Sequence, residues 1–319
     1  MTLVAPSHEG LVILTWTFTG ACIVFSIGRY IIRYKKVGRF CLDDVAHAVA
    51  LLGLVGFVGT YVQIFPYIFQ LCDYLDGKPF KKSGPDYQTV LQLRVAVAIL
   101  FWLCIYGVKF AFLFLYRMLF VVSNRSRNGK IWWSIAGFTS ITFFVCVFGT
   151  LTMCGPVRYV ADSAHCDSVR SGRDSLTVIE YTTTLHIVSD LIIMAFPLFV
   201  LKDLRIKKRQ NVGLSCLFCL ATLIVIFDVL RTAFAVIPSE HGAVIILATT
   251  CDILEASVAV IVSSLPVYGT LLVSNRPQIA KGPHWPSNSR QKMLESSTII
   301  KKSADQDPEY DTARLESDI

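Results

Sequence analysis

Two carboxylates stand three residues apart in an apolar stretch near the C-terminal end of the chain. The stretch Cys251–Gly269 reads CDILEASVAVIVSSLPVYG and contains Asp252 and Glu255 but no Lys or Arg. Residues at this spacing share one face of a helix, so the two acids would be neighbours. Two neighbouring carboxylates in a low dielectric rarely both ionise. We therefore expect that one acid keeps its proton or that a cation joins the two.

Ionisable residues in other apolar stretches could supply that cation. Arg231 lies three residues after Asp228, so these two can also neutralise each other, and Lys109 lies in an earlier stretch. At membrane depth such residues cost about 2.5–3.5 kcal/mol on insertion scales, so they usually face the interior and have partners. The network could serve only to fix helix packing and register. Otherwise it would bind a ligand, for which the candidate residues are Asp252, Glu255, Arg231, Asp228, Lys109, Asp190 and His186.

The composition indicates that membrane helices position these side chains. Of the 319 residues only 17% are charged, against about 25% in soluble domains, and the mean hydropathy is +0.56. A span needs about 20 mostly apolar residues. Seven runs meet this length, and they predict an all-α, polytopic seven-helix bundle over residues 1–275 with a disordered tail at 276–319. The runs are 11–32, 45–69, 93–119, 131–153, 176–200, 212–236 and 243–273.

The distribution of Lys and Arg predicts the orientation. The loops after the first, third and fifth runs carry twice as many of these residues as the segments on the opposite side. Because basic residues favour the cytoplasmic side, we expect the N-terminus outside and the C-terminus in the cytoplasm. The lipid bilayer is the expected partner. Anionic lipid accounts for the basic loops, so no nucleic acid is needed to explain them.

Three of the ten cysteines fall on the predicted outer side, where disulfides persist. We favour a bridge between Cys154 and Cys166, which would shorten one loop, and Cys72 is the alternative partner. The cysteines and histidines do not form a cluster with the spacing of metal ligands, so we expect no metal site.

Several motifs, taken in order, resemble the fungal rhodopsin-domain integral membrane proteins. That family includes a membrane protein of a toxin gene cluster and receptor-like proteins of plant-pathogenic fungi, so the resemblance implies a seven-span, receptor-like membrane protein. There are two departures: His186 stands where the family usually has Asn, and Tyr159 is the only aromatic residue where Trp is common. The resembling segments are GRFCLDD (38–44), KFAFLFLYRMLF (109–120), CGPVRYVADSAHC (154–166), HIVSDLIIMAFPLFVLKDL (186–204), DVLR (228–231) and ILEASVAVIVSSLP (253–266).

The name of that family does not imply retinal in this chain. Opsins hold retinal by a Schiff base to a lysine in the seventh span, and there is no lysine between Ala243 and Asn275. The only deep lysine, Lys109, lies in the third predicted span. We therefore expect no retinal or other cofactor, and neither a light-driven pump nor a photoreceptor.

Three classes of function fit these residues. The first is a receptor-like protein that senses a small apolar ligand from outside and addresses a cytoplasmic signalling partner. The second is an intramembrane enzyme of secondary metabolism, such as an acid-initiated cyclase, in which a neutral Asp252 or Glu255 acts as general acid. The third is a transporter of such a pathway. The receptor-like reading rests on topology and resemblance, which is analogy rather than chemistry.

Overall fold

The computed structural model describes residues 6–38, 40–75, 77, 87–118, 126–152, 173–202, 222, 225–227, 229–233 and 242–274. All regular elements in these ranges are helices, which confirms the all-α prediction. The chain forms two compact units, Met1–Val273 and Ser274–Ile319. Apart from Ser274, the described residues belong to the first unit, and the tail predicted at 276–319 lies outside them.

The long helices match the predicted apolar runs. The first five runs and the seventh each correspond to one helix, while the sixth, 212–236, is described only in part, with helical residues at 222, 225–227 and 229–233. The helices are α1 (His8–Val37), α2 (Leu42–Leu75), α3 (Tyr87–Tyr116), α4 (Ser126–Leu151), α6 (Arg173–Lys202) and α8 (Gly242–Ser274).

Five of these helices, α1, α2, α3, α4 and α8, are long and apolar enough to cross a membrane, judged over the described residues. The protein is therefore a multi-pass membrane protein. The total of seven spans and the outward N-terminus remain predictions.

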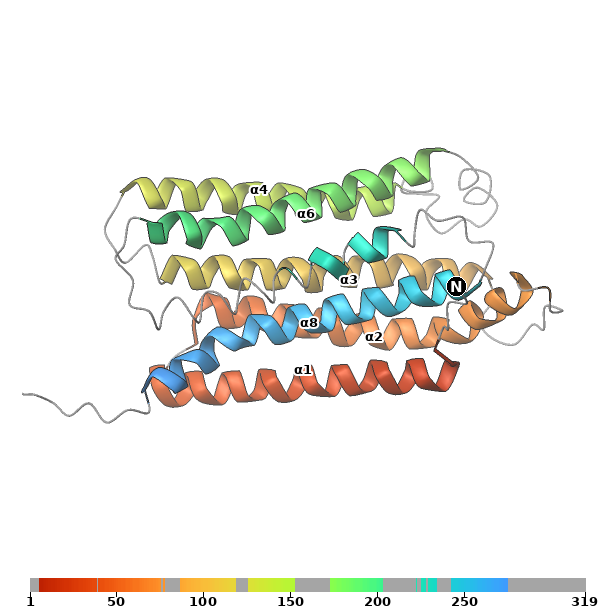
Figure 1. The fold of residues 1–319 in the computed structure, drawn as a ribbon, viewed down its shortest axis with the longest axis horizontal. Coiled ribbons are helices and arrows are strands. Elements are labelled where there is room, and N and C mark those ends of the chain that lie inside the picture. The colour runs from red at the N-terminus through yellow and green to blue at the C-terminus, as the bar shows by residue number, and fades with distance from the viewer. Residues whose placement is uncertain are drawn as a thin grey trace, which may run out of the picture. The chain divides into compact units, whose positions relative to one another are not determined.

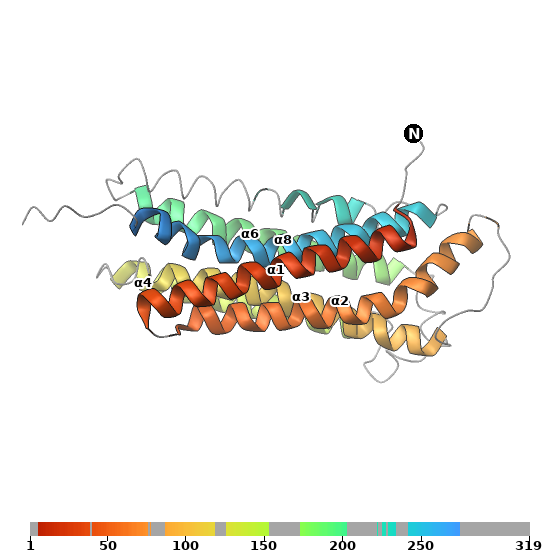
Figure 2. The same cartoon turned by 90° about the horizontal axis from the view of Figure 1, so that it is seen from below.

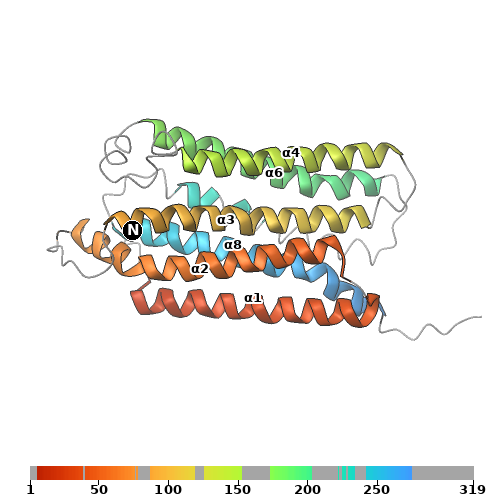
Figure 3. The same cartoon turned by 180° about the vertical axis from the view of Figure 1, so that it is seen from behind.

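Helix α3 lies in the middle of the bundle. It contacts α2 on one side and α4 and α6 on the other, while α1 packs against α2 (Figure 1). Helices α2, α3 and α4 run side by side, and α6 and α8 pass over one face of that row (Figure 2). The view from behind shows the same order from α1 through α2 and α3 to α4 (Figure 3). Helix α8 returns to α1, since the Cys22 thiol donates to the Ser257 carbonyl at 3.3 Å and the Tyr268 hydroxyl donates to the Phe25 carbonyl at 2.8 Å.

Glycine lets α2 and α3 approach closely. A Cβ placed on Gly53 would lie 3.0 Å from the backbone nitrogen of Cys104, and one on Gly107 would lie 3.0 Å from the Cα of Ala50. The sequence pattern Gly53, Gly56 and Gly59 suggests a smooth groove, and the first two face α3. A Cβ on Gly59 would have no atom within 4 Å, so the groove ends before it.

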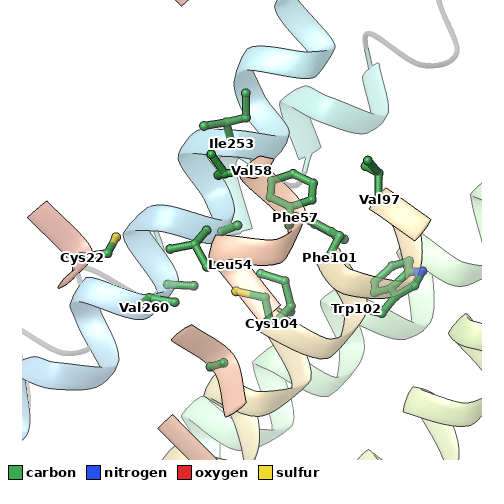
Figure 4. Packing of buried hydrophobic residues seen from close by; sticks show 14 of the residues in the cluster. Cys22, Leu54, Phe57, Val58, Val97, Phe101, Trp102, Cys104, Ile253 and Val260 are labelled. Atoms are coloured by element: carbon green, nitrogen blue, oxygen red, sulfur yellow. The ribbon is translucent and has the colours of Figure 1, made fainter. Parts of the chain in front are cut away.

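The close approach creates the apolar core. Phe57 of α2 and Phe101 of α3 lie against each other, with ring centroids 5.7 Å apart (Figure 4). Ile253 and Val260 of α8 are fully buried in the same cluster, together with Leu54 of α2. Helix α8 is thus held by the core along the segment that carries the two acids.

The turn between α1 and α2 is tight. Gly38 ends α1 in the left-handed region at φ 67°, where its N–H donates to the Tyr34 carbonyl at 3.0 Å. Glycine occupies this region without the penalty that a Cβ imposes. Because α2 begins only four residues later, at Leu42, the last turns of α1 face the first turn of α2. This places the arginines of α1 beside the acids of α2.

We predict that Gly107→Ala destabilises the protein, because the new methyl group must push α2 and α3 apart. Overpacking of this kind costs about 1–3 kcal/mol. The matched control is Gly59→Ala, where the methyl group enters open space. Thermal unfolding in detergent should give a lower Tm for the first variant only. An unchanged Tm for Gly107→Ala would show that the two helices can separate without cost.

The orientation can be tested on sealed right-side-out vesicles that carry an epitope at the C-terminus. Protease added outside should leave the epitope intact, because the tail is predicted to be cytoplasmic. Detergent-opened vesicles are the control and should lose it. Loss of the epitope from sealed vesicles would reverse the predicted topology.

Candidate functional site

One arginine lies between the two acids of α8. The Arg231 Nε is 3.6 Å from Asp252 Oδ1 and 3.5 Å from Glu255 Oε2. The Glu255 side chain is completely buried, whereas the side chains of Arg231 and Asp252 are 19% and 23% exposed. The cluster therefore has an accessible edge at Asp252 and a closed interior at Glu255. We call these three residues the acid cluster.

Helices α2 and α3 support the acid cluster. The Tyr61 hydroxyl of α2 lies 3.3 Å from Asp252 Oδ2 and 3.5 Å from the Thr249 hydroxyl. The Arg231 guanidinium lies over two rings of α3, with its Cζ 5.1 Å from the Phe101 centroid and 5.9 Å from the Trp102 centroid. Cation–π contacts of this kind are worth about 0.5–2 kcal/mol. Aromatic side chains from two helices thus fix the position of both charges.

A second ionic group joins α3 to α6. The Lys109 ammonium lies 3.2 Å from Asp190 Oδ1 and donates to the Ser189 hydroxyl at 2.6 Å and to the His186 carbonyl at 3.1 Å. On the other side, Asp190 Oδ2 is 3.4 Å from His186 Nδ1. Lys109 also sits over the Tyr106 ring at 4.7 Å. The hydrogen bonds and the ion pair hold this lysine between the two helices.

The indole of Trp102 contacts both ionic groups. Its ring lies 5.6 Å from the His186 ring, and the Arg231 Cζ lies 5.9 Å from its centroid. The indole Nε1 donates to the Thr150 hydroxyl of α4 at 3.0 Å, which fixes the orientation of the ring. The acid cluster and the Lys109 group are therefore neighbours through one side chain.

A third network joins α1 to α2 by four charges. Arg29 donates to Asp43 at 2.8 Å and to Asp44 at 3.3 Å, and Arg33 donates to Asp44 at 3.1 Å and also to Asp43. The four side chains are at most 8% exposed. Asp43 and Asp44, with Cys41, have the spacing of metal ligands within the described residues. Because both carboxylates are occupied by guanidinium groups, we do not propose a metal there.

The structure divides the predicted site residues into two groups. Asp252, Glu255 and Arg231 come together as the sequence suggests, while Lys109 pairs with Asp190 and His186 rather than with the α8 acids. Three residues named from the sequence lie outside the described residues, so their proposed roles stay predictions: Asp228, Cys154 and Cys166.

Sequence reasoning missed several contact residues. Tyr61 and Trp102 contact the charges, but neither their type nor their spacing marks them out in an aromatic-rich chain. The distribution of basic residues assigns Arg29 and Arg33 to the first cytoplasmic loop, yet they are buried in α1. Their spacing of four, followed by a short turn and two adjacent aspartates, is the signal that could have found this network.

The comparisons with known proteins agree with the motifs. The family model for the fungal rhodopsin domain matches residues 28–274, which include α2, α3, α4, α6, α8 and all three groups of charges. Comparison with curated proteins and with solved structures gave no match. Since the match covers most of the chain and extends from the end of α1 to the end of α8, this protein belongs to the fungal rhodopsin domain family.

Proposed function

We propose that this protein is a receptor-like membrane protein that senses a small molecule at the acid cluster. The observation that carries the proposal is the sharing of Arg231 between Asp252, which is partly exposed, and Glu255, which is completely buried. A charged group at membrane depth is costly and is often kept for a function. The Lys109 group is closely hydrogen-bonded, and we propose that it holds α3 and α6 together beside the ligand site.

The geometry suggests how a ligand would act. A hydroxyl or ammonium group that binds Asp252 would compete with Arg231 and with the Tyr61 hydroxyl for the same carboxylate. Arg231 would then shift toward Glu255 and keep its place over the Phe101 and Trp102 rings. An apolar body on the ligand would suit the aromatic surroundings. Binding would thus change how α8 is joined to α2 and α3.

The acid cluster suits a receptor better than an acid-initiated enzyme. An ion pair with Arg231 requires an ionised carboxylate, whereas a general acid must carry a proton before it reacts. Both carboxylates of the cluster lie within 3.6 Å of the same guanidinium nitrogen. The alternative functions are a cyclase and a transporter of secondary metabolism. The next experiment distinguishes them from a receptor.

We predict that Glu255→Gln abolishes the function while the protein still folds, because glutamine keeps the shape and removes the charge. A strain with this variant should show the same changes in gene expression as a deletion strain, at a normal amount of protein. Its lipid extract should contain no accumulated precursor. Glu180→Gln, which makes the same exchange at an exposed position of α6, is the control and should behave as wild type.

Two results would contradict this proposal. Wild-type gene expression in the Glu255→Gln strain would show that Asp252 and Glu255 only fix the packing of the helices. A precursor that accumulates in both the deletion and the Glu255→Gln strain would replace the receptor with an enzyme, and a retained end product would replace it with a transporter.

We also predict that Arg231→Ala harms folding more than Glu255→Gln does. Removing one partner of a buried ion pair leaves the other charges uncompensated, at a cost of about 3 kcal/mol or more. The amount of protein in the membrane and its Tm in detergent would measure this. Arg231→Lys keeps the charge and should be intermediate, since an ammonium group cannot reach both acids with the same geometry. A wild-type Tm for all three variants would show that the cluster contributes nothing to stability.

A further inference from the structure

The four-charge network also holds the last part of α8. Arg29 uses its third nitrogen, Nη1, to donate to the backbone carbonyl of Ser263 at 2.5 Å. His47 of α2 lies between the Ser26 hydroxyl of α1, at 2.9 Å, and the Ser263 hydroxyl of α8, at 2.8 Å. A single position of α8 is therefore bound by both α1 and α2.

The α1–α2 half of this arrangement is rigid. Two guanidinium groups and two carboxylates balance in charge, and each arginine contacts both acids. Paired arginine and carboxylate groups add geometric specificity to the energy of the contact. Because the four side chains are buried, separating them would expose charges in a low dielectric. We expect α1 and α2 to move as one body at this end.

The α8 half is held less firmly. Pro266 has no N–H, so the carbonyl four residues earlier, at Val262, lacks its helical donor, and a helix can bend at such a point. Beyond the proline, the Tyr268 hydroxyl donates to the Phe25 carbonyl of α1 at 2.8 Å. Gly28 makes room for that tyrosine, since a Cβ there would collide with the hydroxyl. Among the described residues, hydrogen bonds rather than ion pairs join the end of α8 to α1 and α2.

We propose that Arg29, His47 and Tyr268 form a latch that holds the last turns of α8, and that binding at the acid cluster releases it. Glu255 precedes Ser263 by eight residues, or about 12 Å along the same helix. A shift of α8 at the acid cluster is carried along the helix to the latch. Pro266 then lets the final turns leave α1 while α1 and α2 remain paired. The release step rests on the proposed function, whereas the latch itself can be tested without any ligand.

The test is hydrogen–deuterium exchange of the full-length protein in lipid nanodiscs, read over residues 264–274. Tyr268→Phe and Ser263→Ala each remove one hydrogen bond of the latch, and each should raise the exchange rate about three- to tenfold in this segment. Two variants that delete a hydroxyl elsewhere serve as controls and should not change the exchange rate of this segment. Tyr34→Phe alters an exposed ring of α1, and Thr250→Val alters a hydroxyl that donates, among the described residues, to the Ile246 carbonyl of α8 itself.

A separate variant tests whether a change at the acid cluster releases the latch. Glu255→Gln should raise exchange over residues 264–274 about threefold or more, although Glu255 lies nine residues before this segment. A latch that is already released cannot respond to binding, which agrees with the loss of function expected of this variant. Unchanged exchange in Tyr268→Phe and Ser263→Ala would overturn the latch. Unchanged exchange over 264–274 in Glu255→Gln would overturn the release. Neither result depends on whether the Glu255→Gln strain is active, so failure of the proposed function stays distinguishable.

Discussion

A charge inside a membrane bundle needs a partner of opposite sign, and in the part of the chain that the structure describes most of those partners come from a different helix. Arg231 meets the acids of α8, Lys109 of α3 meets Asp190 of α6, and the arginines of α1 meet the aspartates of α2. Since lipid provides no alternative partner, each pair fixes the rotation of two helices about their axes. The arrangement of the helices therefore depends on these pairs as much as on apolar packing.

The apolar core and the ionic groups depend on each other. The close approach of α2 and α3 at Gly53 and Gly107 brings the rings of Phe57 and Phe101 together, and Phe101 in turn supports the Arg231 guanidinium. Trp102, one residue along α3, extends the same surface toward His186. A polar site between apolar helices is thus supported by aromatic side chains, whose faces attract cations and whose bodies pack like other core residues.

Helix α8 takes part in two polar networks. Near its middle it carries the acid cluster, and near its end it meets Arg29 and His47. Movement of this helix would change both networks together, whereas α1 and α2 share four charges that resist separation. Because α8 is joined to α1 by hydrogen bonds while α1 and α2 are joined by ion pairs, we expect α8 to be the helix that moves in the proposed function.

Local patterns in the sequence determined the helices and the pairing of neighbours on one helix. The apolar runs predicted the positions of α1, α2, α3, α4, α6 and α8, and the spacing of three predicted that Asp252 and Glu255 share a face. Which cation reaches which acid was decided by tertiary structure. From the sequence, both Arg231 and Lys109 were possible partners of the α8 acids. Of these two, Arg231 lies beside the acids and Lys109 lies beside Asp190. The spacing within a helix follows from its 3.6-residue turn, but contact between helices depends on their tilt, rotation and depth, which glycines, a proline and distant side chains set together.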